Sequence, residues 1–216
     1  MAVTFHETWK PAAYDKDLHE RMGKCYAANT FFVVRLALRR EMLLALMRLW
    51  DKDSRTIRMK EGIADILRKP PVINALAADR AERIGMADAE DEMRKDLSQK
   101  ACKAIALVDK YSKNGTHYAV LENLHGLRHK RLAHRQIEAM PVATTDSTDV
   151  EIESFYQDNS ELIHLLLSLV EAVAYDPKET ADVYRYYAAF FWAGVRGERT
   201  EGHPNYRASQ RVTPTT

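Results

Sequence analysis

Apolar residues recur at helical spacing along nearly the whole chain, and this periodicity is the feature that most constrains the fold. Apolar positions three and four residues apart form one face of an α-helix, whereas alternation at every second residue indicates a strand. No stretch of the 216 residues alternates for long enough to predict a sheet. The 8 glycines and 7 prolines are few, and they fall mostly where periodic segments end. The sequence therefore predicts an all-α fold.

The periodic segments and their stop signals define the expected helices. We expect one long helix or two in succession over 15–50, then helices over 59–68, 72–83, 87–113, 116–135, 150–175 and 179–195. Pro71 suits the first turn of its helix, Gly85 and Asn114-Gly115 are stop signals, and Thr148 and Asp149 are both candidate caps. The buried side of 15–50 is expected at these positions: Leu18, Met22, Cys25 or Tyr26, Phe32 or Val33, Leu36, Leu43 or Leu44, Met47 and Trp50.

The length fits a single domain with a polar end. A chain of 216 residues can bury a sizeable core. We expect a single all-α domain over residues 1–196. After residue 196 the sequence is polar, contains proline and glycine and loses its periodicity, so we expect a disordered tail over 197–216.

Compartment signals favour the cytoplasm. The first residues lack the charged-then-apolar pattern of a signal peptide, and arginines interrupt the longest apolar stretches, 31–38 and 42–50, so we expect no membrane span. The two cysteines, Cys25 and Cys102, form neither a disulfide framework nor a zinc-ligand spacing.

The strongest chemical signal is the segment 128–135, Arg-His-Lys-Arg-Leu-Ala-His-Arg. Because the formal net charge is only +1, a nucleic acid has to be held by a local basic patch of this kind. On an ideal helix the buried stripe is marked by Leu121, Leu124 and Leu132. Arginines occupy the positions that should join this stripe: Arg128, Arg131 and Arg135. Since buried arginine is costly without an anion, a carboxylate or water, we expect this helix end to face a groove or an oligomer interface.

These residue types suit RNA cleavage without a metal. A histidine titrates near neutrality, so His134 can take the proton of a ribose 2′-hydroxyl or protonate the leaving oxygen. Arginine pairs with phosphate oxygens and stabilises the charge of the transition state. Lys130 and Arg131 lie one helical turn from His134, and Arg128 lies further along the helix axis. Neighbouring cations favour the neutral base form of a histidine.

Two other interpretations of the segment stay open. Charged helical positions are usually a solvated surface, and short motifs occur by chance. His125 and His129 have the spacing of metal ligands on a helix, but no carboxylate joins them and the surrounding cations oppose a divalent ion. We expect no metal and no other cofactor.

Residues 127–135 resemble the signature of the HEPN superfamily, in which an arginine and a polar residue precede a histidine by a few positions. Arg128 and His134 have five residues between them, and His129 is an accepted second residue. The residue pattern of this segment resembles that of the branch related to the abortive-infection protein AbiU2. Residues 49–57, Leu-Trp-Asp-Lys-Asp-Ser-Arg-Thr-Ile, are similar to that branch's segment after its first long helix. The resemblance covers about residues 18–175.

The resemblance implies a HEPN-like bundle of antiparallel long helices with short additional helices. It implies a homodimer in which the arginine and histidine of both chains face one composite cleft. It also implies a metal-independent endoribonuclease of a toxin–antitoxin or phage-defence (abortive-infection) system, with an antitoxin or a nucleotidyltransferase as a further type of partner.

The resemblance also implies roles for single residues. Arg128 would stabilise the phosphate, His134 would act as acid and base, and His129 would be the polar second residue. We expect Lys130, Arg131 and Arg135 to support RNA binding, Arg131 from helical spacing alone. The alternatives are a non-catalytic HEPN module that binds RNA, a nucleotide or a partner protein, and a purely structural scaffold.

Three further features have a structural interpretation that is favoured over a functional one. Trp50, Asp51, Asp53 and Arg55 indicate a turn with caps and ion pairs. His164 lies in an apolar run and is expected to be packed and hydrogen-bonded. The aromatic residues near the C-terminus favour core or dimer packing over a base-stacking platform: Tyr184, Tyr186, Tyr187, Phe190, Phe191 and Trp192.

Overall fold

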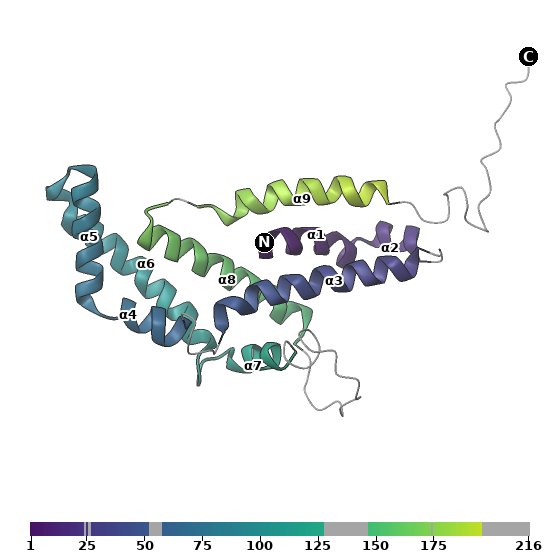
Figure 1. Cartoon of the computed structure of the whole chain (residues 1–216), viewed down its shortest axis with the longest axis horizontal. Coiled ribbons are helices and arrows are strands. Elements are labelled where there is room, and N and C mark those ends of the chain that lie inside the picture. The colour runs from purple at the N-terminus through teal and green to yellow at the C-terminus, as the bar shows by residue number, and fades with distance from the viewer. Residues whose placement is uncertain (24, 26, 52–57, 128–146, 174, 196–216) are drawn as a thin grey trace, which may run out of the picture. The chain divides into compact units, whose positions relative to one another are not determined.

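The computed structural model describes residues 1–23, 25, 27–51, 58–127, 147–173 and 175–195, and every regular element among them is helical (Figure 1). The all-α prediction is confirmed. None of the described helices has the length and apolarity that a membrane span requires. The elements are α1 (Ala2–Tyr14), α2 (Lys16–Met22), α3 (Ala28–Met47), η1 (Arg48–Trp50), η2 (Met59–Ala64), α4 (Asp65–Leu67), α5 (Pro70–Ile84), η3 (Ala87–Ala89), α6 (Glu90–Tyr111), α7 (Tyr118–Leu127), α8 (Asp149–Val170) and α9 (Pro177–Gly194).

Two compact units make up the described chain. The first contains Met1–Met42 together with the segment that starts at Lys178, and the second contains Leu43–Pro177. A single domain over residues 1–196 stays a prediction. The expected disordered tail, 197–216, lies outside the described residues.

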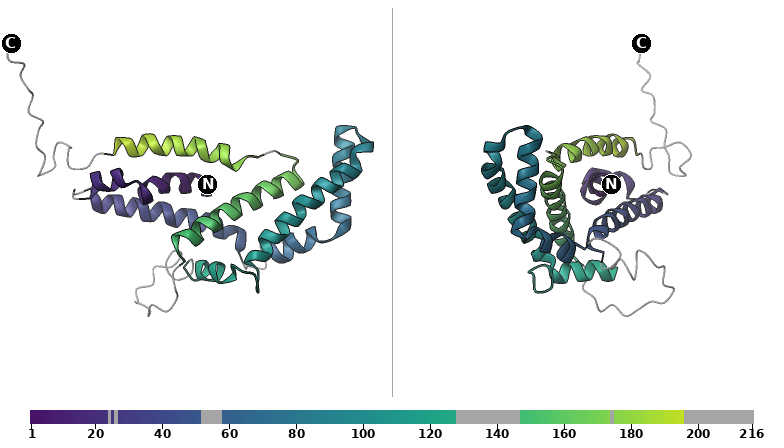
Figure 2. Two further views of the ribbon diagram at one scale, coloured as in Figure 1. Left: turned by 180° about the vertical axis from the view of Figure 1, so that it is seen from behind. Right: turned by 60° about the vertical axis from the view of Figure 1, so that its left-hand side comes forward.

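The first unit packs its N-terminal helices against α9, which runs beside α1 in Figures 1 and 2. Trp192 of α9 is the centre of this packing. Its ring contacts Phe31 of α3 edge-on at 5.7 Å, and its indole N–H donates to the carbonyl oxygen of Thr8 at 2.8 Å. Arg21 donates to the carbonyl oxygen of Trp192 itself. Together with Trp192, the core of this unit contains Ala12, Leu18, Met22, Cys25, Phe31 and Ala188.

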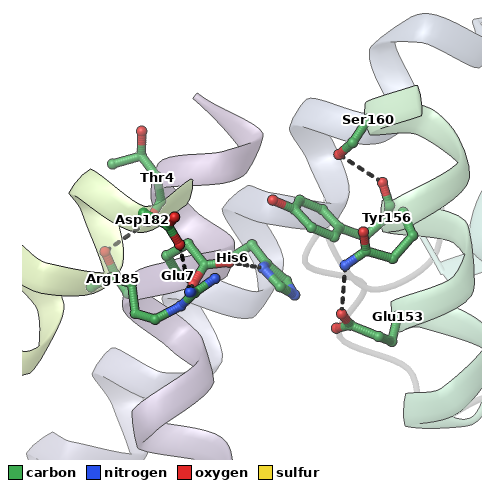
Figure 3. A network of polar contacts seen from close by, with 10 residues as sticks. Thr4, His6, Glu7, Glu153, Tyr156, Ser160, Asp182 and Arg185 are labelled. Carbon is green, nitrogen blue, oxygen red and sulfur yellow. Dashed lines mark hydrogen bonds and ion pairs between the residues drawn. The ribbon is translucent and has the colours of Figure 1, made fainter. Parts of the chain in front are cut away.

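A buried carboxylate joins α1 to α9 (Figure 3). Glu7 is 2% exposed, and it accepts hydrogen bonds from His6 at 2.9 Å and from Arg185 at 3.0 Å. Arg185 also pairs with Asp182 on its own helix. Burial acts to raise the pKa of the Glu7 carboxyl, but the hydrogen bonds from His6 and Arg185 outweigh it and lower this pKa. Glu7 is therefore ionised and paired.

The predicted buried side of residues 15–50 is correct at both ends and wrong in the middle. Leu18, Met22, Cys25, Leu43, Met47 and Trp50 are buried as expected. Phe32, Val33 and Leu36 are more than half exposed, and Phe31 is buried instead. At the start of α3 the buried side follows Phe31, Val34 and Leu38, one or two positions away from the predicted stripe, and it rejoins that stripe by Leu43. α2 ends at Met22 and α3 starts at Ala28, so the stripe of α2 does not continue directly into α3.

The prediction of core packing for the aromatic residues of α9 is also correct for one residue and wrong for others. Trp192 is buried, which confirms core packing for this residue. Tyr186, Tyr187, Phe190 and Phe191 are 58–65% exposed, so core packing within the described chain is wrong for these four.

The second unit is built on α5, α6 and α8, with α6 in contact with both of the others. Both prolines lie in the first turn of α5, and Gly85 ends it with a φ of 68°, which glycine adopts without strain. Thr148 caps α8 in a reciprocal arrangement: its hydroxyl accepts from the Glu151 N–H, and its own N–H donates to the Glu151 carboxylate. His164 bonds the carbonyl oxygen of Tyr175, as predicted.

The Glu7 carboxylate should make stability depend on pH. Its folded pKa lies below the ordinary value of about 4.3. Its contribution is therefore complete above that value and is lost as pH falls through the lower folded pKa. We expect Glu7→Gln to reduce the free energy of unfolding near neutral pH by about 1–3 kcal/mol and to flatten the acid decline. Urea titrations at several pH values measure both effects.

The control for this experiment is Asp182→Asn, because Asp182 contacts the same arginine but is exposed. A surface pair contributes at most about 1 kcal/mol, so this variant should keep the parent's acid decline. An unchanged acid decline in Glu7→Gln would contradict the role given to the buried carboxylate.

Candidate functional site

All of the predicted site residues lie outside the described residues, so their contacts stay predictions: Arg128, His129, Lys130, Arg131, His134 and Arg135. The structure describes the helix that leads to them. α7 ends at Leu127, directly before Arg128. Leu121 and Leu124 are buried on its inward side, as the helical projection predicts, and Leu132 is outside the described part of the chain.

A tight turn sets the start of α7 against the end of α6. The N–H of Gly115 donates to Ser112 at 2.7 Å, and the N–H of His117 donates to the carbonyl oxygen of Lys110 at 2.9 Å. Asn114 has a φ of 77°, a conformation that asparagine tolerates better than most residues. A Cβ at Gly115 would overlap the carbonyl oxygens of Asp109 and Lys110, so only glycine fits there.

Trp50, at the start of the second family-like segment, is anchored in the core of its unit. Its side chain is buried, and its indole N–H donates to the buried Asn159 amide oxygen at 2.7 Å. Asn159 donates in turn to the carbonyl oxygen of Phe155. The Trp50 ring lies 5.4 Å from that of Tyr111 and 6.2 Å from that of Phe155. This packing gives Trp50 a structural role, while the predicted turn with caps and ion pairs stays a prediction, because Asp53 and Arg55 lie outside the described residues.

Tyr111 is held as a hydrogen-bond donor. Its hydroxyl donates to Asp158 at 2.6 Å, and Lys110 binds the same carboxylate oxygen at 2.5 Å. Burial and the bond to Asp158 raise the pKa of the Tyr111 hydroxyl far above its ordinary value. Tyr111 therefore stays protonated and serves to position its neighbours rather than to transfer protons.

These anchors surround a surface pocket of about 290 Å³. Asp51 and His125 line it, so it joins the beginning of the 49–57 segment to the helix turn that precedes Arg128. Three cations and three carboxylates border it, which makes it close to neutral. The complete lining is Trp50, Asp51, Arg58, Met59, Lys60, Glu61, Tyr111, Ser112, Lys113, Tyr118, Leu121, Glu122 and His125.

Sequence reasoning alone missed several residues of this pocket. Arg58 and Lys113 lie in connections and Lys60 lies in η2, none of them in a motif, and only the fold brings them beside α7. Asn159, the hydrogen-bond partner of Trp50, could have been singled out from the sequence, because it is a polar residue on the apolar side of α8. Within the described residues no cluster of three metal-ligating side chains occurs, and the His125–His129 pair falls partly outside them.

The described elements are all helical, as the resemblance to the HEPN superfamily implies. The family model of AbiU2 matches residues 1–191, and the chain belongs to this family. The match confirms the resemblance seen in the two segments and extends it into α1 and α9. No curated protein and no solved structure matches the chain.

Removing the indole N–H should weaken the anchor of the pocket. Trp50→Phe keeps an aromatic ring but leaves the Asn159 oxygen without this donor. We expect the free energy of unfolding to fall by about 1–3 kcal/mol in urea titrations. A double-mutant cycle with Asn159→Leu isolates the pair, and a coupling energy near zero would contradict the anchor.

The turn glycine gives a matched pair of variants. Gly115→Ala should destabilise the protein by about 1–3 kcal/mol, because its Cβ meets two backbone carbonyls. Gly126→Ala in α7 meets nothing within 4 Å and should stabilise it by up to about 1 kcal/mol. Chemical denaturation followed by circular dichroism measures both, and equal effects would refute the close approach at Gly115.

Proposed function

We propose that this protein is a metal-independent endoribonuclease of an abortive-infection or toxin–antitoxin type system. It would cut RNA at a composite arginine and histidine cleft in a homodimer. The observation that carries the proposal is the pocket that Asp51 and His125 both line. It lies in a chain of the AbiU2 family whose Arg128 and His134 match the HEPN signature.

The described residues support this location. The buried leucines of α7 and the tight turn at Gly115 hold the helix that leads into Arg128. Arg58, Lys60 and Lys113 line the adjacent pocket and are exposed, so they supply cations for an RNA backbone. The carboxylates of Asp51, Glu61 and Glu122 line the same pocket and offset these positive charges. The pocket would therefore bind only a short stretch of the RNA backbone next to the motif.

The proposed reaction needs no cofactor. A histidine takes the proton of the ribose 2′-hydroxyl as its oxygen attacks the adjacent phosphorus, and the 5′-oxygen leaves with a proton. His134 carries this proton transfer, and Arg128 stabilises the added negative charge on the phosphate. His129, Lys130, Arg131 and Arg135 hold the strand on either side. The products are a 2′,3′-cyclic phosphate and a 5′-hydroxyl.

Purified protein should cut single-stranded RNA in the presence of EDTA. His134→Ala should lower the cleavage rate by at least about 100-fold, since it removes the acid and base. Far-UV circular dichroism should stay that of the parent. End-group analysis of labelled RNA identifies the cyclic phosphate.

The matched control is His164→Gln, because His164 bonds a backbone carbonyl in the second unit and has no part in the proposed chemistry. It should cut at the parental rate. If His134→Ala cuts as fast as the parent, the assigned mechanism is wrong. RNA binding with a steep salt dependence and no product would instead establish a non-catalytic binding module.

A further inference from the structure

The lining of the pocket beside α7 changes its chemistry with burial. Its buried members are Trp50, Tyr111, Leu121 and His125. Trp50 and Tyr111 direct their polar atoms away from the pocket, because the indole N–H donates to Asn159 and the phenol hydroxyl donates to Asp158. With Leu121 beside them, these two side chains give the buried part of the lining a mainly apolar and aromatic surface.

The residues nearer the surface are polar. Asp51, Tyr118 and Glu122 line the pocket and are half-buried. Arg58 and Lys113 line it too and are exposed. From the buried part to the rim, the lining therefore runs from aromatic and apolar surface, through two carboxylates and a tyrosine, to cations.

This order fits a nucleotide that enters with its base first. A base has flat apolar faces, which stack on aromatic side chains, and polar atoms along its edges. A phosphate, in contrast, is costly to bury against tryptophan and leucine, and it belongs at the rim beside the cations. Backbone contacts alone use only the rim and leave the buried part of the pocket without a purpose.

The size of the pocket limits it to one base. Its volume is about 290 Å³, at the lower end of the range of about 300–1,000 Å³ for small-molecule sites. Proteins that read single-stranded RNA commonly hold a base turned out of its stack in such a site. A run of stacked bases would need a longer groove.

The carboxylates select among the four bases. An ionised carboxylate only accepts hydrogen bonds, and it has about four acceptor sites, so contacts within the chain leave it capacity for a ligand. Guanine presents two adjacent donors, N1–H and the N2 amine, which one carboxylate accepts together. Adenine and cytosine each place an acceptor nitrogen beside their amine, and uracil places carbonyls on both sides of its one N–H. These acceptors repel a carboxylate.

The cations at the rim favour the same base. Guanine carries the acceptors O6 and N7 on the edge next to its donors, and lysine or arginine is the usual partner of these atoms. The pocket offers carboxylates and cations together, as guanine requires. Uracil and cytosine lack a second ring and would also leave more of the pocket unfilled.

We infer that this pocket binds a guanine base of single-stranded RNA. Tyr118 stacks on the base, Glu122 accepts its N1 and N2 donors, and Lys113 lies at the rim with the phosphate. The assignment rests on the proposed function and deepens it, because the guanine held here belongs to the strand that is cut at the adjacent motif.

Isothermal titration of the purified full-length protein with the four 5′-nucleoside monophosphates tests the pocket. GMP should bind at least about 10-fold more tightly than AMP, CMP or UMP, since a good bidentate contact discriminates between bases by this order. A protein that binds GMP no more tightly than the other three, or does not bind it, overturns the assignment.

Two variants separate the stacking contact from the selective one. Tyr118→Leu should weaken the binding of GMP at least about 10-fold, because it removes the aromatic ring, and Tyr118→Phe should weaken it less. Glu122→Gln should lower the preference for GMP over AMP at least about 5-fold, because one acceptor oxygen becomes a donor.

The matched control is Glu92→Gln. Glu92 is an exposed glutamate in the first turn of α6 that pairs with Lys95 and is not part of the pocket lining. This variant should keep the parent's preference for GMP, and the circular dichroism spectrum of every variant should be that of the parent. A Glu122→Gln protein that selects GMP as strongly as the Glu92→Gln protein overturns the role given to Glu122.

Mapping of the cut positions in single-stranded RNA separates this assignment from the proposed function. A protein that selects GMP and never cuts RNA leaves the guanine pocket established and the ribonuclease refuted. Cleavage without any preference for guanine does the reverse. Where both hold, the cuts lie beside guanines, and Glu122→Gln spreads them to other bases.

Discussion

The buried hydrogen bond between Trp50 and Asn159 is the interaction on which the candidate site depends. It fixes the end of the first long helix to the middle of α8, and the rings of Tyr111 and Phe155 close around it. A buried polar pair of this kind is costly to break, because each partner would be left without water. The pair therefore specifies one packing, in which Asp51 begins its connection beside the turn that starts α7.

From this anchor the approach to the motif follows step by step. Tyr111 ends α6, the turn over residues 112–117 leads into α7 within a few residues, and α7 then buries Leu121 and Leu124. Asp51 and His125, which are distant in the sequence, thus line one pocket.

The first unit depends on a different constraint, the packing of α9 on the N-terminal helices. Trp192 supplies the apolar contact, and Glu7 with Arg185 supplies a charged one. Both use one side of α9 only. The opposite side keeps its aromatic rings exposed.

The sequence by itself determined the helical class and most helix ends. Gly85, Asn114-Gly115 and the Thr148–Glu151 cap are local signals, since each acts on the backbone within a few residues. The resemblance carried by 49–57 and 127–135 was likewise readable without a fold. α1 was not predicted, because it has no side-chain cap and contains Pro11, and burial of Trp9 and Ala12 stabilises it instead. Only the tertiary structure decided the rotation of α3, the partner of Trp50, the lining of the pocket and which aromatic residues of α9 are exposed. Periodicity shows which side of a helix is apolar, but the neighbour that covers that side is chosen by packing between distant segments.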